Sequence, residues 1–518
     1  MNPFKEEFAE VDDHPLTMKW LFSAQKATRR ILATQQYHLH GGSRFTRTIT
    51  NSGWSELYCI RYSSLFSGYH YSTSTLFNTE ECSHRLMNGN TQENNIQKVD
   101  LEVISRETIK PTSPTPHHLR TFNLSLIDKV MFDVYSPLIL FLPNTNKASV
   151  KDVVTTRSKH LKEALSEVLT QFYPLAGKVM DNLHIECNDE GVYYKETRVN
   201  QTLNDFLSDP DDPKVRELMP ESPRTRESSA GNFLISVQVN IFSCGGIEAA
   251  RGAPQTISPS FVNSKIFPGN PCLEYSVPSK LMTSKNLTTK RFVFNSNALT
   301  LLKAQPVACS SSSRAPTRME ATTAVIWKAA AKAASTVRSF SPQSPYALLS
   351  VVNFRKRASP PLPSESFGNL IDVAGAICLP ERQPDLPTLM GELRESIVKV
   401  NSDHIESMKG EKGHETINES LKNLNHLAEV TREGDCLFSS SLLNGGMYEL
   451  DFGWGKPIWF YVTNAGFCRF LHLNDMLKGG GVEAIVTLSP EEMEIFERDH
   501  ELLSFATVNP SPLQFLNN

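Results

Sequence analysis

The sequence predicts an α/β protein of two globular domains. The chain has 518 residues, which is more than one hydrophobic core usually serves. Hydrophobic residues make up 40% of it, which is enough for two cores. Helical and strand patterns both occur, without the regular rhythm of a doubly wound parallel fold. We therefore expect an N-terminal domain over residues 97–285 and a C-terminal domain over residues 286–518.

Residues 1–96 differ from the rest of the chain. They open acidic, become rich in Ser, Thr and Tyr, and show no sustained helical or strand period. A transit peptide would fit the basic part, but the acidic opening argues against one. We expect a disordered extension, or an error of gene prediction with translation starting at Met87.

Four elements can be placed from local patterns. Val99, Leu101 and Val103 alternate as in a first strand, and residues 235–241 alternate as in a half-buried strand. A helix is expected before Pro174 and Gly177, with His160 on its solvated side. Its apolar face comprises Leu161, Leu165, Val168, Leu169 and Phe172. A further helix should begin after Ser489 as N-cap, with Pro490 at its first position and Glu492 closing a capping box.

Charge and cysteine content exclude several classes of protein. The net charge is −4 and basic residues are scattered, which argues against a nucleic-acid surface. The nine cysteines include no CxxC pair, so neither a disulfide framework nor a zinc site is expected. The most apolar run, residues 136–143, is too short to span a membrane. We expect a soluble, monomeric, cytoplasmic protein without a metal, a nucleic-acid partner or a membrane partner.

The segment DFGWGKP, residues 451–457, is the most informative motif. Two glycines flank a tryptophan after an aspartate, which indicates a tight turn held by a carboxylate and one large aromatic ring. By itself this pattern is typical of a structural element. We therefore interpret Asp451, Phe452, Gly453, Trp454 and Gly455 as a structural motif.

The same motif resembles the DFGWG signature of the plant BAHD acyltransferases, which move acyl groups from coenzyme A to alcohols or amines. Further segments resemble that family in the same order, over about Lys98 to Pro512. They are LSLID (124–128), FYPLAGKV (172–179), ECNDEGVYY (186–194), NFRKRASPPLP (353–363) and FGN (367–369). The details are most similar to the vinorine-synthase-like branch of alkaloid and terpenoid acetyltransferases.

This resemblance implies two domains like chloramphenicol acetyltransferase, each a mixed β-sheet with helices, with the active site in a channel between them. It implies acyl-CoA, most simply acetyl-CoA, as co-substrate and a small specialised metabolite as acceptor. The acceptor must lose a proton as it attacks the thioester, and an oxyanion must be stabilised. In the family the histidine of an HxxxD motif removes that proton, while the aspartate pairs with an arginine.

No histidine of this chain is followed by an aspartate four residues later. In the family the motif follows a glycine turn and an apolar strand, and this chain has the turn at Gly245 and Gly246. Residues from Glu248 onward show no returning strand. We infer that roughly two dozen residues, one strand and most of one helix, are missing at residues 247–249. We place the inferred deletion at Glu248.

Two residues remain as candidates for roles near the missing motif. Arg355 matches the arginine that pairs with the HxxxD aspartate, although a solvated basic turn would explain it too. His472 is the least implausible substitute base, and a core or edge-strand histidine is the competing interpretation.

The sequence thus predicts an acyltransferase by lineage that lacks its base and is inactive as written. The alternatives are a non-catalytic ligand-binding protein that keeps the fold, and an unstable product of a mis-predicted transcript.

Overall fold

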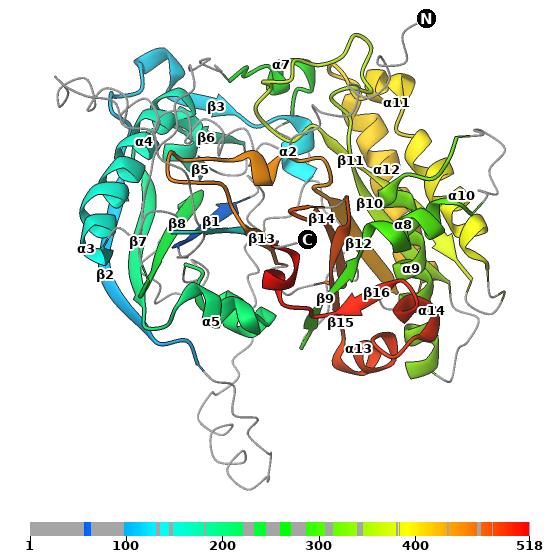
Figure 1. The fold of residues 1–518 in the computed structure, drawn as a ribbon. Helices are drawn as coiled ribbons and strands as arrows, with labels where there is room; N and C mark the ends of the chain where they lie inside the picture. The colour runs from blue at the N-terminus through cyan, green and yellow to red at the C-terminus, as the bar shows by residue number, and fades with distance from the viewer. Residues whose placement is uncertain are drawn as a thin grey trace, which may run out of the picture.

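The computed structural model describes most of the chain from residue 98 onward, together with one earlier segment. The described residues are 56–63, 98–130, 135–144, 149–180, 183–220, 233–244, 259–270, 286–305, 314–338, 345–379, 382, 384–431, 435–463, 468–478 and 480–516. They form two large mixed sheets with helices packed against them (Figure 1). The predicted two-domain α/β class is confirmed.

The first sheet has six strands and belongs mainly to the N-terminal half of the chain. In spatial order they are β13 (Trp459–Val462), β4 (Tyr135–Leu142), β1 (Glu56–Ser63), β8 (Ile235–Phe242), β7 (Val192–Val199) and β2 (Leu101–Ile109). All neighbours pair antiparallel except β7 and β8, which pair parallel. One of its strands, β13, comes from the range predicted for the second domain. The sheets therefore do not divide cleanly between residues 285 and 286.

Two of these six strands were predicted from alternation. Strand β8 covers the predicted segment, although all eight of its residues are buried rather than one face only. Strand β2 begins at Leu101, within the predicted first strand. Strand β1 lies within residues 1–96, for which the sequence predicted a disordered extension or an error of gene prediction, and it pairs with β4 on one side and β8 on the other. The rest of residues 1–96 lies outside the described residues.

Helices and a small sheet cover the first large sheet. The helix α4 (Ser158–Gln171) continues a π-helical turn, η2 (Val153–Arg157), and ends before η3 (Tyr173–Ala176), as Pro174 predicts. His160 is 2% exposed, so its predicted solvated position is wrong. The buried stripe of α4 includes Ala164 and Val168, one and two turns beyond His160, and is wider than the large apolar residues alone indicate.

The remaining elements of this half are short. They are η1 (His117–Leu119), α2 (Leu126–Val130), α3 (Val150–Asp152), α5 (Leu203–Ser208), α6 (Asp212–Glu217), α7 (Asn263–Ile266) and the three-stranded sheet of β3 (Thr121–Asn123), β6 (His184–Glu186) and β5 (Lys178–Met180).

The second large sheet has seven strands, all from residue 288 onward. In spatial order they are β11 (Ile371–Cys378), β10 (Tyr346–Asn353), β12 (Cys436–Ser441), β14 (Phe470–Asp475), β15 (Val482–Leu488), β9 (Thr288–Phe294) and β16 (Ala506–Val508). The pairs β10–β12 and β12–β14 are parallel and the others antiparallel.

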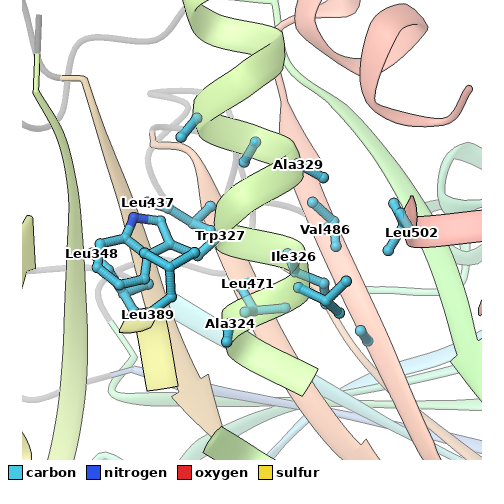
Figure 2. Close-up of a cluster of buried hydrophobic side chains, with 14 of the residues drawn as sticks. Ala324, Ile326, Trp327, Ala329, Leu348, Leu389, Leu437, Leu471, Val486 and Leu502 are labelled. Carbon is cyan, nitrogen blue, oxygen red and sulfur yellow. The ribbon is translucent and has the colours of Figure 1, made fainter. Parts of the chain in front are cut away.

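One face of this sheet is covered by a core centred on the helix α9 (Arg318–Val337). Alanine dominates α9, so the helix approaches the sheet closely, and Trp327 fills the space between its axis and the strands (Figure 2). The neighbouring helices are α8 (Ser296–Lys303), α10 (Leu386–Val398), α13 (Pro490–Phe496) and α14 (His500–Leu503). Helix α13 has the capping box predicted for Ser489 and Glu492.

The opposite face of the second sheet is shared between a helix and the first sheet. Residues of α12 (Gly413–Val430) pack on the β10–β12 end. At the other end Ile485 joins a cluster formed mainly by the first sheet, including Phe141, Phe242 and Trp459. The remaining short helices are α11 (Ser402–Ser407), η6 (Met447–Glu449) and η7 (Pro512–Phe515). In the part of the chain that is described, no helix has the length and apolarity needed to cross a bilayer.

Candidate active site between the two sheets

The two large sheets meet where β13 lies against β15 and β9. The indole Nε1 of Trp459 donates to Glu483 at 3.1 Å, and the Arg291 guanidinium lies 4.8 Å from the Trp459 ring centroid. Arg291 also forms an ion pair of 2.8 Å with Glu483. All three side chains are buried. This polar contact fixes how one sheet faces the other.

The first sheet presents buried polar side chains on the face that it turns toward the second sheet. Along β8, Gln238 and Asn240 alternate with the apolar residues of the N-terminal core and are themselves fully buried. Asn240 accepts hydrogen bonds from Thr197 and from Gln238, at 2.5 and 2.7 Å, and donates to the Leu218 carbonyl at 2.8 Å. Among the described residues, none forms a hydrogen bond with the Gln238 Oε1 atom. A buried layer of this kind can position polar groups of a ligand.

His472 belongs to the facing side of the second sheet. It lies on β14, directly opposite Ile485 of β15, and is 5% exposed. Its Nδ1 is hydrogen-bonded to the Ser440 hydroxyl at 2.6 Å, and its Nε2 has no hydrogen-bond partner in the part of the chain that the structure describes. Burial lowers the pKa of His472 to about 4. The imidazole is therefore neutral at pH 7, but it is a weak base.

The DFGWG segment forms a turn closed by its own aspartate. The Asp451 Oδ1 atom accepts hydrogen bonds from the amides of Gly453 and Gly455, at 2.8 and 3.2 Å. Both glycines have positive φ, 104° and 125°, which side chains with a Cβ rarely adopt. The turn places Phe452 and Trp454 in the core of the N-terminal half, with the Arg157 guanidinium 5.6 Å from the Trp454 ring.

Arg355 lies in a second junction, formed by three of the segments on which the family resemblance depends. Its guanidinium donates to the carbonyl oxygens of Gly368 and Ser366, at 3.0 and 3.3 Å. Asp128, at the end of LSLID, accepts from the backbone amide and the side-chain amide of Asn369, at 3.0 and 2.8 Å. Burial raises the pKa of Asp128. The residues LSLID, NFRKR and FGN thus meet in space although they are far apart in sequence.

The Asp128–Asn369 contact was missed by sequence reasoning. Both residues stand inside segments that were quoted, but nothing in a single sequence links residue 128 to residue 369. The inferred deletion cannot be compared with the structure, because residues 245–258, with Glu248, lie outside the described residues. The structure does place Ser243 and Cys244 in a turn directly after β8. Among the described residues no group of three or more His, Cys, Asp or Glu side chains could hold a metal ion.

Comparison with known families gives a match in two pieces. The model described as the Transferase family matches residues 99–250 and residues 248–503. The two pieces meet at residues 248–250, where the strand pattern breaks off.

Curated relatives agree with this match. A limonoid 7-O-acetyltransferase of Citrus sinensis is 33% identical over 462 residues, covering 80% of this chain and 99% of that protein. An epi-neemfruitin B 7-O-acetyltransferase of Melia azedarach is 32% identical, with the same coverage. Stemmadenine O-acetyltransferase of Catharanthus roseus is 30% identical, covering 77% of this chain and 96% of that protein.

Solved structures agree as well. Vinorine synthase is 29% identical and superposes with a TM-score of 0.65, covering 80% of this chain and all of that one. The TRI101 protein of F. graminearum, in complex with ethyl coenzyme A, is 15% identical with a TM-score of 0.52 and shares the fold. From the family match, the relatives and the fold together, the chain belongs to the plant BAHD acyltransferase family.

Proposed function

We propose that this chain descends from a CoA-dependent O-acetyltransferase of specialised metabolism. Its relatives include, by name, O-acetyltransferases of a limonoid, of epi-neemfruitin B and of stemmadenine, which supports an alcohol as acceptor and acetyl-CoA as donor. One relative, from Strychnos nux-vomica, is an N-malonyltransferase, so an amine acceptor and another acyl-CoA fit the same lineage. We place the protein in the cytoplasm as a monomer that needs no metal.

We further propose that the chain as written does not catalyse acyl transfer. The sequence has no HxxxD motif, and the two family-matched pieces join where that motif is expected. His472 is a poor replacement, because its pKa is about 4 and its Nδ1 is engaged with Ser440. A positioned general base contributes about 10²- to 10⁴-fold in rate. Loss of that base is the observation on which the proposal depends.

A non-catalytic ligand-binding protein is the second candidate. It is favoured by β1, which pairs with both of its neighbours and so closes the first sheet without the missing strand. A protein with a closed sheet can keep its fold and its layer of buried polar residues. This observation disfavours the third alternative, an unstable product.

Two forms of the protein test the proposal. One is the chain as written, and the other carries the strand, HxxxD turn and helix of the Citrus sinensis relative inserted after Ile247. Release of free thiol from acetyl-CoA is measured with a panel of alcohols and amines. We expect turnover from the repaired form alone, and loss of it when the inserted histidine is alanine. Binding of coenzyme A to the unrepaired form, measured by calorimetry, tests the ligand-binding alternative.

Turnover of the unrepaired form comparable to that of the repaired form would contradict the proposal. His472 would then be the base to examine. The turnover of the unrepaired form should then fall in the variant His472→Gln, and its rate should rise with pH around a midpoint near 4.

A further inference from the structure

The strand β8 ends in a turn that should lead into a partner strand. The turn at Ser243 and Cys244 is present, but the chain beyond it has no alternating pattern. A strand that returns from such a turn would pair antiparallel with β8. In the structure β8 has β7 on one side, which pairs parallel, and β1 (residues 56–63) on the other side, which pairs antiparallel. Figure 1 shows β1 beside β8, although the two lie far apart in sequence.

The pairing of β1 is regular on both sides. Every residue from Glu56 to Ser63 has a partner in β4, from Leu142 back to Tyr135. Leu57 to Tyr62 pair with β8, from Asn240 back to Ile235. Neither register is interrupted by a bulge.

The position of β1 is one that the fold cannot leave empty. Without β1, the strands β4 and β8 would lie about two strand spacings apart, roughly 9–10 Å, with their facing amide and carbonyl groups unpaired. All residues of β8 and residues Pro137–Leu142 of β4 are buried in the sheet that contains β1. Both hydrophobic clusters of this half take side chains from β4 and from β8.

We propose that residues 56–63 act as a substitute strand, which fills the position of the strand expected after the Ser243–Cys244 turn. The family match begins at residue 99, so this strand comes from a part of the chain outside the matched region. Residues 56–63 are then an integral part of the first sheet. The inference depends on strand pairing and does not require any catalytic activity.

A corollary rests on the proposed function, which holds that a returning strand is missing. The position between β4 and β8 has room for one strand. A restored strand after Ile247 and β1 therefore exclude each other. In the repaired form the amides of residues 57–62 should lose their protection from hydrogen exchange.

The register offers a direct test with a native cysteine. Cys59 lies opposite Gln238, and directly opposed residues on neighbouring strands have Cα separations within the range that a disulfide spans. Under mild oxidation the variant Gln238→Cys should form a disulfide between Cys59 and the introduced cysteine, identified by peptide mapping. Val239→Cys, shifted by one residue, turns its side chain to the other face and should not link to Cys59. No Cys59 link in the first variant, or equal links in both, would overturn the inference.

Proline substitution tests whether the strand matters for the fold. Ile60→Pro removes an amide donor from the middle of a six-stranded sheet. Thr73→Pro is the matched control, because it lies in the same extension outside β1. We expect Ile60→Pro to lower the melting temperature or to abolish folding, while Thr73→Pro melts like the wild type. Slow hydrogen exchange of residues 57–62 in the wild-type chain is expected as well, and either free exchange there or identical melting of both variants would refute the proposal.

Discussion

At the scale of single residues, the resemblance to the family depends on side chains that hold backbone rather than on side chains that do chemistry. The carboxylate of Asp451 binds two glycine amides, Arg355 binds two carbonyl oxygens, and Asp128 binds the amides of Asn369. These contacts fix the backbone of the segments in which they lie. A signature can therefore persist in a chain whose catalytic motif is absent, because the fold needs it independently.

The role proposed for Asp451 leads to a stability prediction. Asp451→Ala leaves the amides of Gly453 and Gly455 without their acceptor in a buried turn, which costs about 1–3 kcal/mol for each unsatisfied group. We expect a lower melting temperature, and a smaller loss in Asp451→Asn, which keeps an acceptor oxygen. Lys456→Ala is the control, since its ion pair with Glu449 is exposed. Unchanged melting of Asp451→Ala would show that the carboxylate is dispensable for the turn.

At the scale of secondary-structure elements, the N-terminus of α9 is fixed by a capping box and by two arginines. Thr317 and Glu320 form a capping box, and Glu320 also accepts hydrogen bonds from Arg394 and Arg314. Burial alone would raise the pKa of Glu320, but the two arginines lower it to about 2. Glu320 and Arg394 are 2% and 1% exposed, so α9 and α10 are joined by a buried ion pair.

We expect Glu320→Gln to be strongly destabilising, by about 3–5 kcal/mol, because it leaves Arg394 buried without its countercharge. The folded pKa of about 2 lies below the ordinary value of 4.5, so the stabilisation is complete above pH 4.5 and is lost as the pH falls toward 2. The difference in melting temperature from the wild type should therefore shrink on acidification. Glu163→Gln, which breaks an exposed pair with Lys159, serves as the comparison and should cost about 0–1 kcal/mol. A large difference that persists at pH 2 would contradict this account.

The elements also show what the sequence could and could not predict. Strand β8 and the cap of α13 were predictable, because alternation and a capping box are local patterns. Strand β1 was missed although Tyr58, Ile60 and Tyr62 have high β-propensity and alternate. A strand pattern of only eight residues, within a long stretch that shows no sustained periodicity, is a weak signal for a strand. A local pattern also cannot predict that this strand pairs with β4 and β8. The contact of Asp128 with Asn369 was hidden for the same reason.

At the scale of the whole molecule, the two halves depend on each other unequally. The second sheet takes all its strands from residue 288 onward, and its main core uses residues 292–506. The first sheet needs β13, and its core includes Leu450, Phe452, Trp454 and Phe460. The boundary predicted at residue 285 is therefore a boundary for the second sheet but not for the first.

This asymmetry can be tested by expressing the halves separately. Residues 1–285 alone should be insoluble or molten, because β4 loses β13 and the core loses its aromatic residues. Residues 286–518 alone should be more soluble. Co-expression of both fragments should restore the folding of the fragment 1–285. Circular dichroism and hydrogen exchange report the outcome. Cooperative melting of the isolated 1–285 fragment would show that β13 is an accessory strand.

The place of β13 in the first sheet also has a consequence for synthesis on the ribosome. Strand β1 is made before β4, so one side of β4 can be covered as soon as β4 emerges. The other side waits for residues 459–462, which are made after more than half of the chain has followed. At about 5–20 residues per second, this delay lasts tens of seconds. During that time the edge of β4 that will pair with β13 stays unpaired in the growing polypeptide. An unpaired apolar strand edge can aggregate or be bound by a chaperone.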